Sequence, residues 1–172
     1  MNTLYVSDLD GTLLNTNDEI SSYSVRTINQ LIEKGMLFTY ATARSLSSAS
    51  VVTKGLTTNI PVIVYNGAFI MNASTREVLS SSSFDEKEKQ NVITLLEYYH
   101  LYPLVYSFIN GLEKVTWDPS YENEGMQRYL CLRKGDQRLN PLNAKHNLYE
   151  GDVFYLYRRE KRITTPISGF KR

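Results

Sequence analysis

The chain has 172 residues and a formal net charge of +1; 42% of its residues are hydrophobic and 22% are charged. This composition is that of a globular protein and excludes a disordered one, and the length suits one domain, or one domain with a small insertion. No apolar run approaches the ~20 residues of a membrane span, and residues 1–6 show no signal-peptide pattern. The single cysteine, Cys131, excludes an internal disulfide, so we expect a cytoplasmic protein that is neither secreted nor membrane-bound.

The charge is distributed unevenly along the chain. Residues 158–172 hold six basic side chains and one acidic one, whereas the preceding residues hold 13 basic and 17 acidic side chains. The acidic body argues against a nucleic-acid-binding protein. The basic tail could contact an anionic partner, although a solvated chain end is the more common role of such a segment.

The first part of the chain alternates between two hydrophobic patterns. Short apolar runs indicate buried strands at residues 4–7, 36–41 and 62–65. Apolar residues at helical spacing indicate helices at residues 22–34 and 45–56. This order is typical of a parallel sheet with right-handed crossovers, so we predict an α/β fold with a partial Rossmann-like core.

The pattern changes after this core. Residues 68–83 predict short strands and end in a serine run, which we interpret as a domain boundary. A capping-box pattern at Asp85 and Glu88 predicts a helix to about residue 99. The pair Asn110-Gly111 between apolar segments 104–109 and 112–117 predicts a hairpin.

A further helix and strand complete the second part of the chain. The helix is expected within residues 121–133, with Cys131 as a buried thiol, and the last strand at residues 153–157. We therefore predict three segments: an α/β core at residues 1–83, an α+β unit at residues 84–157 and a basic tail.

The segment Asp8-Leu9-Asp10-Gly11-Thr12 carries the clearest chemical signal. Two carboxylates at this spacing leave a strand end on the same side, where a parallel sheet forms its ligand crevice. Gly11 allows the backbone to turn sharply and approach a ligand. A hard cation such as Mg²⁺ prefers oxygen ligands and would relieve the repulsion between Asp8 and Asp10. The alternative to a metal-binding site is an acidic turn that has no function.

Residues 4–12 resemble the first motif of the haloacid dehalogenase-like superfamily of phosphohydrolases. The resemblance extends through Ala41-Thr42-Ala43-Arg44 and Tyr65-Asn66-Gly67-Ala68, which look like the Cof-type branch. That branch inserts an α/β cap after the third strand, and the unit at residues 84–157 fits the start of such a cap. The resemblance implies Mg²⁺-dependent hydrolysis of a small phosphorylated metabolite, of the sugar phosphate or nucleotide type.

The resemblance also implies individual roles. Asp8 would be the nucleophile that forms an aspartyl-phosphate, and Asp10 the general acid and then the general base. Asp8 and the backbone carbonyl of Asp10 would bind Mg²⁺. Backbone N–H groups near Gly11, the Thr42 hydroxyl, and the N–H groups of Ala43 and Arg44 at a helix start would hold the phosphate.

Simpler interpretations remain open at three of these positions. Thr42 is a helix-capping residue by type, and Arg44 could form a surface ion pair. Asn66-Gly67 is a hairpin turn by sequence rule, whereas the resemblance would place Asn66 at the mouth of the site, against the substrate.

Two parts of the superfamily pattern have no match in this sequence. We find neither the lysine that neutralises the phosphate nor a second acidic pair after an apolar strand. Gly135-Asp136 follows two basic residues, and Gly151-Asp152 precedes a strand, so neither fits. We therefore expect a member truncated within its cap, with the strand that bears Asp8 at an exposed sheet edge, open to self-association or a complementing chain. The alternative to an active phosphatase is a chain that has lost its activity. It would then be a non-catalytic remnant that binds phosphate or a protein, or half of a split enzyme.

Overall fold

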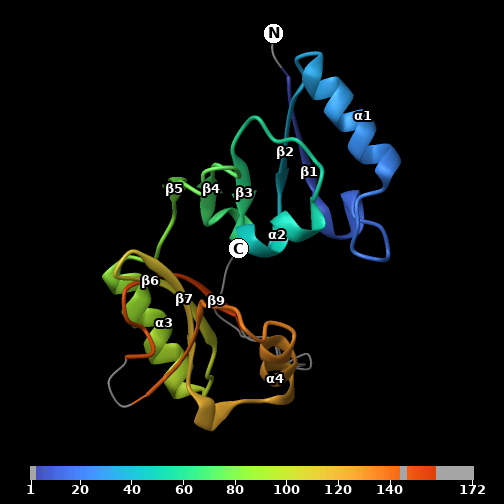
Figure 1. Ribbon diagram of the computed structural model, residues 1–172. Helices are drawn as coiled ribbons and strands as arrows, with labels where there is room; N and C mark the ends of the chain where they lie inside the picture. The colour runs from blue at the N-terminus through green and yellow to red at the C-terminus, as the bar shows by residue number, and fades with distance from the viewer. Residues whose placement is uncertain (1–2, 144–146, 158–172) are drawn as a thin grey trace. The chain divides into compact units, whose positions relative to one another are not determined.

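The computed structural model describes residues 3–143 and 147–157, and the chain divides into two compact units, Met1–Ser82 and Ser83–Arg172. Each unit is built on its own sheet (Figure 1). The basic tail predicted at residues 158–172 lies outside the described residues. Within the described ranges, no helix is both long and apolar enough to cross a membrane.

The first unit is a five-stranded sheet with two crossover helices, α1 (Ser22–Glu33) and α2 (Leu46–Val52). In spatial order its strands are β1 (Leu4–Asp8), β2 (Leu37–Ala41), β3 (Val62–Val64), β4 (Phe69–Met71) and β5 (Val78–Ser81). The first three run parallel, and β4 and β5 continue the sheet antiparallel. The predicted α/β fold is confirmed, and it aligns the carboxyl ends of β1 and β2.

Local hydrogen bonds fix the two helices of this unit. The Ser21 hydroxyl caps α1 by accepting from the Ser24 N–H at 3.0 Å, and Asn29 of α1 donates to the Gly55 carbonyl at 2.8 Å. The second helix ends four residues earlier than predicted, at Val52. Gly55 adopts a φ of 88°, which only glycine tolerates easily, and turns the chain back towards β3.

The core of the first unit lies around β2 and β3. Its buried side chains are Leu9, Leu14, Ile32, Phe38, Tyr40, Leu46, Ala49, Val62, Val64, Tyr65 and Phe69. The interior of β2 is almost free of solvent, with Tyr40 only 1% exposed. This packing holds the ends of β2 and β3 in place beside β1.

The first strand, β1, forms as predicted, but the expectation that it is buried is wrong. It lies at the edge of the sheet and pairs in continuous parallel register with β2, from Leu4 beside Leu37 to Asp8 beside Ala41. The side chains of Leu4, Tyr5 and Val6 are exposed, at 50% or more. Among the described residues β1 has a neighbouring strand on one side only, as expected for a chain that stops within its cap, and this explains the exposure.

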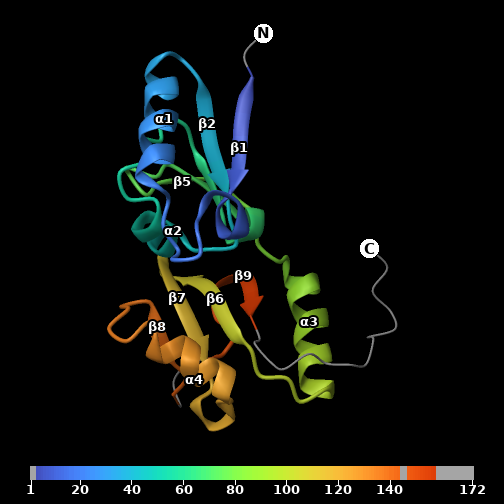
Figure 2. The same cartoon turned by 90° about the vertical axis from the view of Figure 1, so that its right-hand side faces the viewer.

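The second unit is a four-stranded sheet with two helices, and Figure 2 shows it from the side. In chain order its elements are α3 (Glu86–Tyr98), β6 (Leu104–Ile109), β7 (Leu112–Trp117), α4 (Glu124–Cys131), β8 (Leu139–Pro141) and β9 (Asp152–Tyr157). The strands lie in the order β8-β7-β6-β9. The short strand β8 was not predicted, because three residues that include a proline carry no strand pattern.

Several local predictions for this unit are confirmed. Asp85 and Glu88 form a complete capping box at the start of α3. Asn110 and Gly111 both have positive φ, 53° and 75°, as the tight hairpin between β6 and β7 requires. The expectation of a buried thiol is wrong: Cys131 is exposed, because it ends α4 on the solvent side while Met126 and Tyr129 point inward.

A charged cluster stabilises the second unit. The Arg138 guanidinium donates to Asp136 at 2.7 Å and to Glu113 at 2.9 Å, and its side chain is 15% exposed. Hydrogen bonding to Arg138 lowers the pKa of Asp136, whereas burial raises the pKa of Glu113. Asp136 is thus engaged in a structural ion pair within this unit, which agrees with our rejection of Gly135-Asp136 as a metal-binding motif.

Candidate functional site at the end of the first strand

The acidic motif forms the turn that follows β1. Asp8 ends the strand, and its carboxylate accepts a hydrogen bond from the Leu9 N–H at 2.7 Å. Leu9 is fully buried and anchors the turn, while Asp8 and Asp10 on either side of it are exposed. Gly11 follows with a φ of 76°, which reverses the chain direction. The alternation of one buried leucine between two carboxylates therefore presents both acids at the strand end.

Thr42 and its neighbours come from the adjacent strand. Asp8 pairs with Ala41 in the β1–β2 register, so the loop that follows β2 begins beside the acidic turn. Thr42 is buried, its N–H donates to the Ile63 carbonyl at 3.0 Å, and its hydroxyl accepts from the Arg44 N–H at 3.1 Å. This hydroxyl is thereby fixed in the loop between β2 and α2.

The helix cap of α2 differs from the expectation. Ser45 is the capping residue, since its hydroxyl accepts from the Ser48 N–H at 3.2 Å, so the interpretation of Thr42 as the cap is wrong. Ala43 and Arg44 precede the helix and do not belong to its first turn. The Arg44 N–H is already bonded to Thr42, so it does not point freely to a ligand in this structure.

Arg44 joins this loop to the acidic turn. Its guanidinium donates to both carboxylate oxygens of Asp10, from Nε to Oδ2 at 2.9 Å and from Nη2 to Oδ1 at 2.5 Å. Asp18 lies 3.4 Å from the same Nη2. The ion pair that we considered for Arg44 therefore exists, and its carboxylate partner is the proposed acid and base itself.

This contact stabilises the ionised form of Asp10. The hydrogen bonds from Arg44 hold the pKa of the Asp10 carboxyl below its ordinary value, and the same pair raises the pKa of Arg44. Asp10 is therefore ionised near neutral pH and can only accept hydrogen bonds. To deliver a proton it would first have to be released from Arg44.

Asn66 lies in the turn between β3 and β4. The turn Tyr65–Gly67 joins two antiparallel strands, so the hairpin interpretation is correct for the backbone. The Asn66 N–H donates to the Thr42 carbonyl, and the Tyr65 N–H donates to the Arg44 carbonyl, both at 3.0 Å. These bonds draw the turn against the phosphate-binding loop that we predict, with the exposed Asn66 at its surface.

The charges at this end of the sheet favour a cation. Asp10 and Asp18 both lie against the Arg44 guanidinium, and Asp8 adds a third carboxylate at the end of β1. Among the described residues, no group of three or more His, Cys, Asp or Glu side chains is arranged to hold a metal ion. Mg²⁺ usually keeps several waters and takes one or two carboxylates with the substrate phosphate, so the Asp8 carboxylate and the Asp10 carbonyl suit such a site.

Sequence reasoning missed Asp18. It lies eight residues after Asp10, in a loop rich in polar residues, and adopts a φ of 59°. No spacing rule connects it to Arg44, because the contact depends on how the loop folds back towards the sheet. Only the structure shows that it adds a second carboxylate to this guanidinium.

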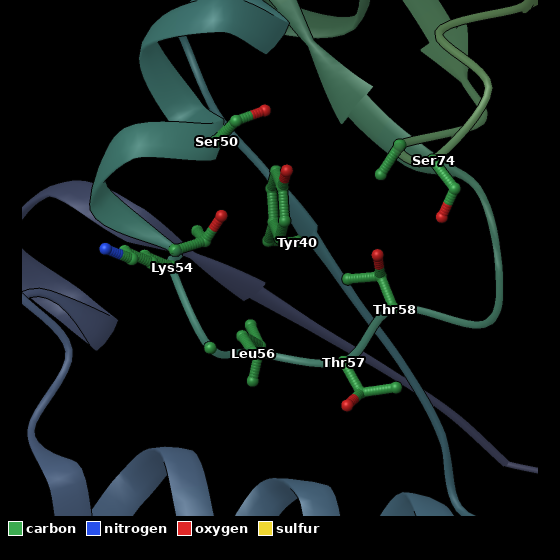
Figure 3. Close-up of a pocket in the computed structure, with 10 residues that line it drawn as sticks. Tyr40, Ser50, Lys54, Leu56, Thr57, Thr58 and Ser74 are labelled. Atoms are coloured by element: carbon green, nitrogen blue, oxygen red, sulfur yellow. The ribbon is translucent and has the colours of Figure 1, made fainter.

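A separate hollow of about 360 Å³ lies around Tyr40 on the first unit (Figure 3). Hydroxyl groups predominate in its lining, which comprises Tyr40, Ser50, Thr53, Lys54, Gly55, Leu56, Thr57, Thr58, Ala73 and Ser74. Burial raises the pKa of Tyr40, so its phenol stays protonated. None of the predicted site residues lines this hollow. We therefore place the candidate site by its chemistry at the end of β1 and not in this hollow.

With this geometry in place, comparison with known proteins identifies the family. The sequence model of the haloacid dehalogenase-like hydrolases matches residues 5–161, so the chain belongs to this family. The Mycoplasma genitalium protein MG265, whose name assigns it provisionally to the phosphatases, is 27% identical over 114 residues, which cover 63% of this chain and 41% of that protein. A Buchnera aphidicola protein with a similar designation is 34% identical over 77 residues, covering 45% of this chain and 29% of its own length.

Solved structures agree with this assignment. The structure of TM0651 from Thermotoga maritima superposes with a TM-score of 0.58 at 27% identity, covering 81% of this chain and 50% of that one. BT1666 from Bacteroides thetaiotaomicron, described as a phosphatase of the same superfamily, gives a TM-score of 0.62 at 16% identity, covering 83% and 50%, which supports the fold alone. The chain thus spans half the length of these two structures, and less than half the length of the two relatives above.

Proposed function

We propose that this chain hydrolyses small phosphate monoesters, of the sugar phosphate or nucleotide type, through an aspartyl-phosphate on Asp8. The observation that carries the proposal is the meeting of Asp8 and Asp10 with Thr42 and Arg44 at one end of the sheet. Membership of the hydrolase family and similarity to proteins designated as phosphatases support the reaction class.

The proposed reaction has two steps. An Asp8 carboxylate oxygen attacks phosphorus, the bond to the leaving oxygen breaks, and Asp10 donates a proton to that oxygen. Asp10 then accepts a proton from water as the water attacks the phosphoryl group, which releases phosphate and restores Asp8. Mg²⁺, held by Asp8 and the Asp10 carbonyl, would neutralise charge on the phosphoryl oxygens.

In this scheme Arg44 can bind either Asp10 or the substrate phosphate. A substrate phosphate is a doubly charged acceptor that suits the planar guanidinium fork. When the phosphate takes Arg44, the pKa of Asp10 rises, because the hydrogen bonds that lower it are lost. Substrate binding would in this way make protonation of Asp10 easier than in the free chain, where Arg44 opposes it. Thr42 would add a hydroxyl donor to the phosphate.

We further propose that the second unit acts as the cap that selects the substrate and that the chain works in the cytoplasm. The family match continues through residue 161 and so includes the whole described part of that unit. The partner expected is a small phosphorylated metabolite and neither nucleic acid nor membrane.

A second candidate function is binding of phosphate or a protein without turnover. It is favoured by the engagement of Asp10 with Arg44 and by the exposed edge of β1, which leaves one side of the candidate site without a wall among the described residues. A split enzyme completed by another chain is the related alternative, and it predicts turnover only when that chain is added.

A phosphatase assay separates these functions. We expect the purified chain to hydrolyse an aryl phosphate in the presence of Mg²⁺ but not of excess chelator, and Asp8→Asn to abolish the activity. Asp18→Asn, which changes the more distant of the two carboxylates beside Arg44, serves as the matched control and should retain most of the activity. Phosphate binding by calorimetry with no turnover above Asp8→Asn would support the second candidate instead.

A further inference from the structure

The hollow around Tyr40 is built from the first unit and shares no residue with the candidate site (Figure 3). Its walls are helix α2, the loop that joins α2 to β3, and the turn between β4 and β5, while the buried Tyr40 of β2 forms its floor. Its volume of about 360 Å³ lies near the lower end of the roughly 300–1,000 Å³ typical of small-molecule sites. The hollow therefore has the size of a site for one small molecule.

Helix α1 fixes the loop that forms one wall of the hollow. The Asn29 side-chain amide donates to the Gly55 carbonyl and accepts from the Thr57 N–H, both at 2.8 Å. An amide that pairs with the backbone in both directions holds this loop much as a neighbouring strand would. The wall thus has its shape without a ligand.

The opposite wall, the turn between β4 and β5, is also held in place. The Asn72 side chain accepts from the N–H groups of Ser74 at 2.9 Å and Thr75 at 3.1 Å. Arg76 donates to the Ser47 hydroxyl at 2.6 Å, which ties the turn to α2. A site whose walls are already ordered loses less conformational entropy when a ligand binds.

Hydroxyl groups from three walls face this space. The hydroxyls of Ser50 and Thr53 each donate to a carbonyl of the preceding helical turn, at 2.7 and 2.9 Å, so their oxygens remain able to accept. The side chains of Thr58 and Ser74 turn towards the same space in Figure 3, and their hydroxyls bond to no other described residue. The hollow therefore offers both donors and acceptors to a ligand.

The charges around the hollow favour a neutral ligand. The sequence contains no Asp or Glu between Glu33 and Glu77, so the lining carries no carboxylate that could hold a cation. Lys54 is the one charged residue of the lining, and Figure 3 shows its nitrogen turned away from Thr58 and Ser74. An anion would therefore find no cationic group pointing at it from the lining. Hydroxyl groups on the ligand suit the hydroxyl groups of the walls best.

We propose that this hollow binds one neutral polyhydroxylated molecule, of the size of a monosaccharide or an inositol. The ligand's hydroxyls donate to Ser50 and Thr53 and pair with the hydroxyls of Thr58 and Ser74. Leu56 adds an apolar contact for the C–H groups of the ligand. The inference does not depend on the proposed function, because none of the residues with a role in the proposed phosphate hydrolysis lines the hollow.

Amide NMR spectra of the full chain test the proposal. D-glucose, D-galactose, D-ribose and myo-inositol are titrated separately, and sodium phosphate serves as the anionic comparison. We expect at least one of the four neutral compounds to shift the signals of Thr58 and Ser74 until they saturate, with a dissociation constant in the millimolar range. Phosphate should leave these two signals unchanged.

Three variants connect the binding to the hydroxyl groups. Thr58→Val keeps the branched shape but removes one hydroxyl, and it should weaken binding about fivefold. Thr57→Val is the matched control, because the Thr57 hydroxyl is turned away from Thr58 (Figure 3), and it should bind like the wild type. Ser74→Ala changes an exposed residue of the opposite wall and should weaken binding to a similar degree. The spectra themselves show whether each variant is folded.

Four results would overturn the proposal. The first is the absence of a saturable shift with any of the four neutral compounds. The second is a shift of the Thr58 and Ser74 signals by phosphate alone, which would indicate an anion site. The third is binding that Thr58→Val and Ser74→Ala leave unchanged, which would place the ligand elsewhere. The fourth is equal weakening by Thr57→Val, which would show that the hydroxyls facing the hollow have no special role.

Discussion

Replacing Arg44 by methionine removes the guanidinium from Asp10 while keeping a long side chain in the loop. In the structure this guanidinium binds both oxygens of Asp10 and lies 3.4 Å from Asp18. We expect Arg44→Met to raise the pKa of Asp10 and to lower the stability of the first unit at neutral pH. The physical reason is that Arg44 forms charge-assisted hydrogen bonds to Asp10 and also lies beside Asp18. Without the guanidinium these two carboxylates repel each other.

The size of the effect follows from the exposure of the pair. The side chains of Arg44 and Asp10 are 21% and 49% exposed, so solvent screens them. Exposed ion pairs contribute roughly 0.2–1 kcal/mol, and the two-pronged geometry places this one near the upper end, at about 1 kcal/mol. Because the pKa of Asp10 lies below its ordinary value of 3.8 in the folded chain, the contribution is complete above that value and is lost as the pH falls through the lowered pKa.

Urea unfolding and carbon-13 NMR of the Asp10 carboxyl measure this prediction. The wild-type chain should exceed Arg44→Met in stability near neutral pH, and the difference should close in acid. Arg76→Met is the control, because Arg76 donates to the Ser47 hydroxyl at 2.6 Å and not to a carboxylate. A difference that persists unchanged in acid, or an unaltered Asp10 pKa, would show that Arg44 acts by packing and would refute the reasoning.

Further predictions concern backbone strain and buried charge. Gly11→Ala and Gly151→Ala change glycines with nearly equal φ, 76° and 77°, but only at Gly151 would the new Cβ collide with the Phe108 carbonyl. We expect a loss of roughly 1–2 kcal/mol for Gly11→Ala and about 1–3 kcal/mol more for Gly151→Ala in urea unfolding; equal losses would contradict this. Arg138→Met should cost about 3 kcal/mol, because its carboxylate partners are only 21–25% exposed, whereas Lys89→Met, whose partner Glu86 is 87% exposed, should cost no more than about 0.5 kcal/mol. Thermal unfolding followed by circular dichroism compares the two variants, and similar losses would show that the partly buried network contributes no more than the Lys89 pair.

Local patterns were sufficient to predict most elements of the fold. The hairpin at Asn110-Gly111 and the capping box at Asp85 depend on residues within a few positions of each other, and both are present as expected. The parallel sheet followed from the alternation of strand and helix patterns. Burial was harder to predict. The apolar residues of β1 form the pattern of a core strand, whereas their exposure depends on which strands and helices lie beside β1.

The candidate site shows the same limit. The spacing of Asp8 and Asp10 placed both carboxylates at the strand end, and the β1–β2 register brings Thr42 beside them. The cap of α2 shifted to Ser45, since several serines and threonines in that segment could each cap a helix. The contact of Arg44 with Asp10 spans 34 positions, and it could not be read from spacing.

The most direct test of the central claim is detection of the phosphoryl group on Asp8. In Asp10→Asn both steps lose their proton carrier, but an aryl phosphate has a leaving oxygen that departs without a proton, so only the second step stops. After incubation with an aryl phosphate and Mg²⁺ the chain should therefore carry one added phosphoryl group. Mass spectrometry of the acid-quenched chain should locate it on Asp8, and hydroxylamine should remove it, as expected of an acyl phosphate. The double variant Asp8→Asn, Asp10→Asn should carry none. Absence of the adduct from wild type and Asp10→Asn alike, or its presence at another residue, would contradict the account.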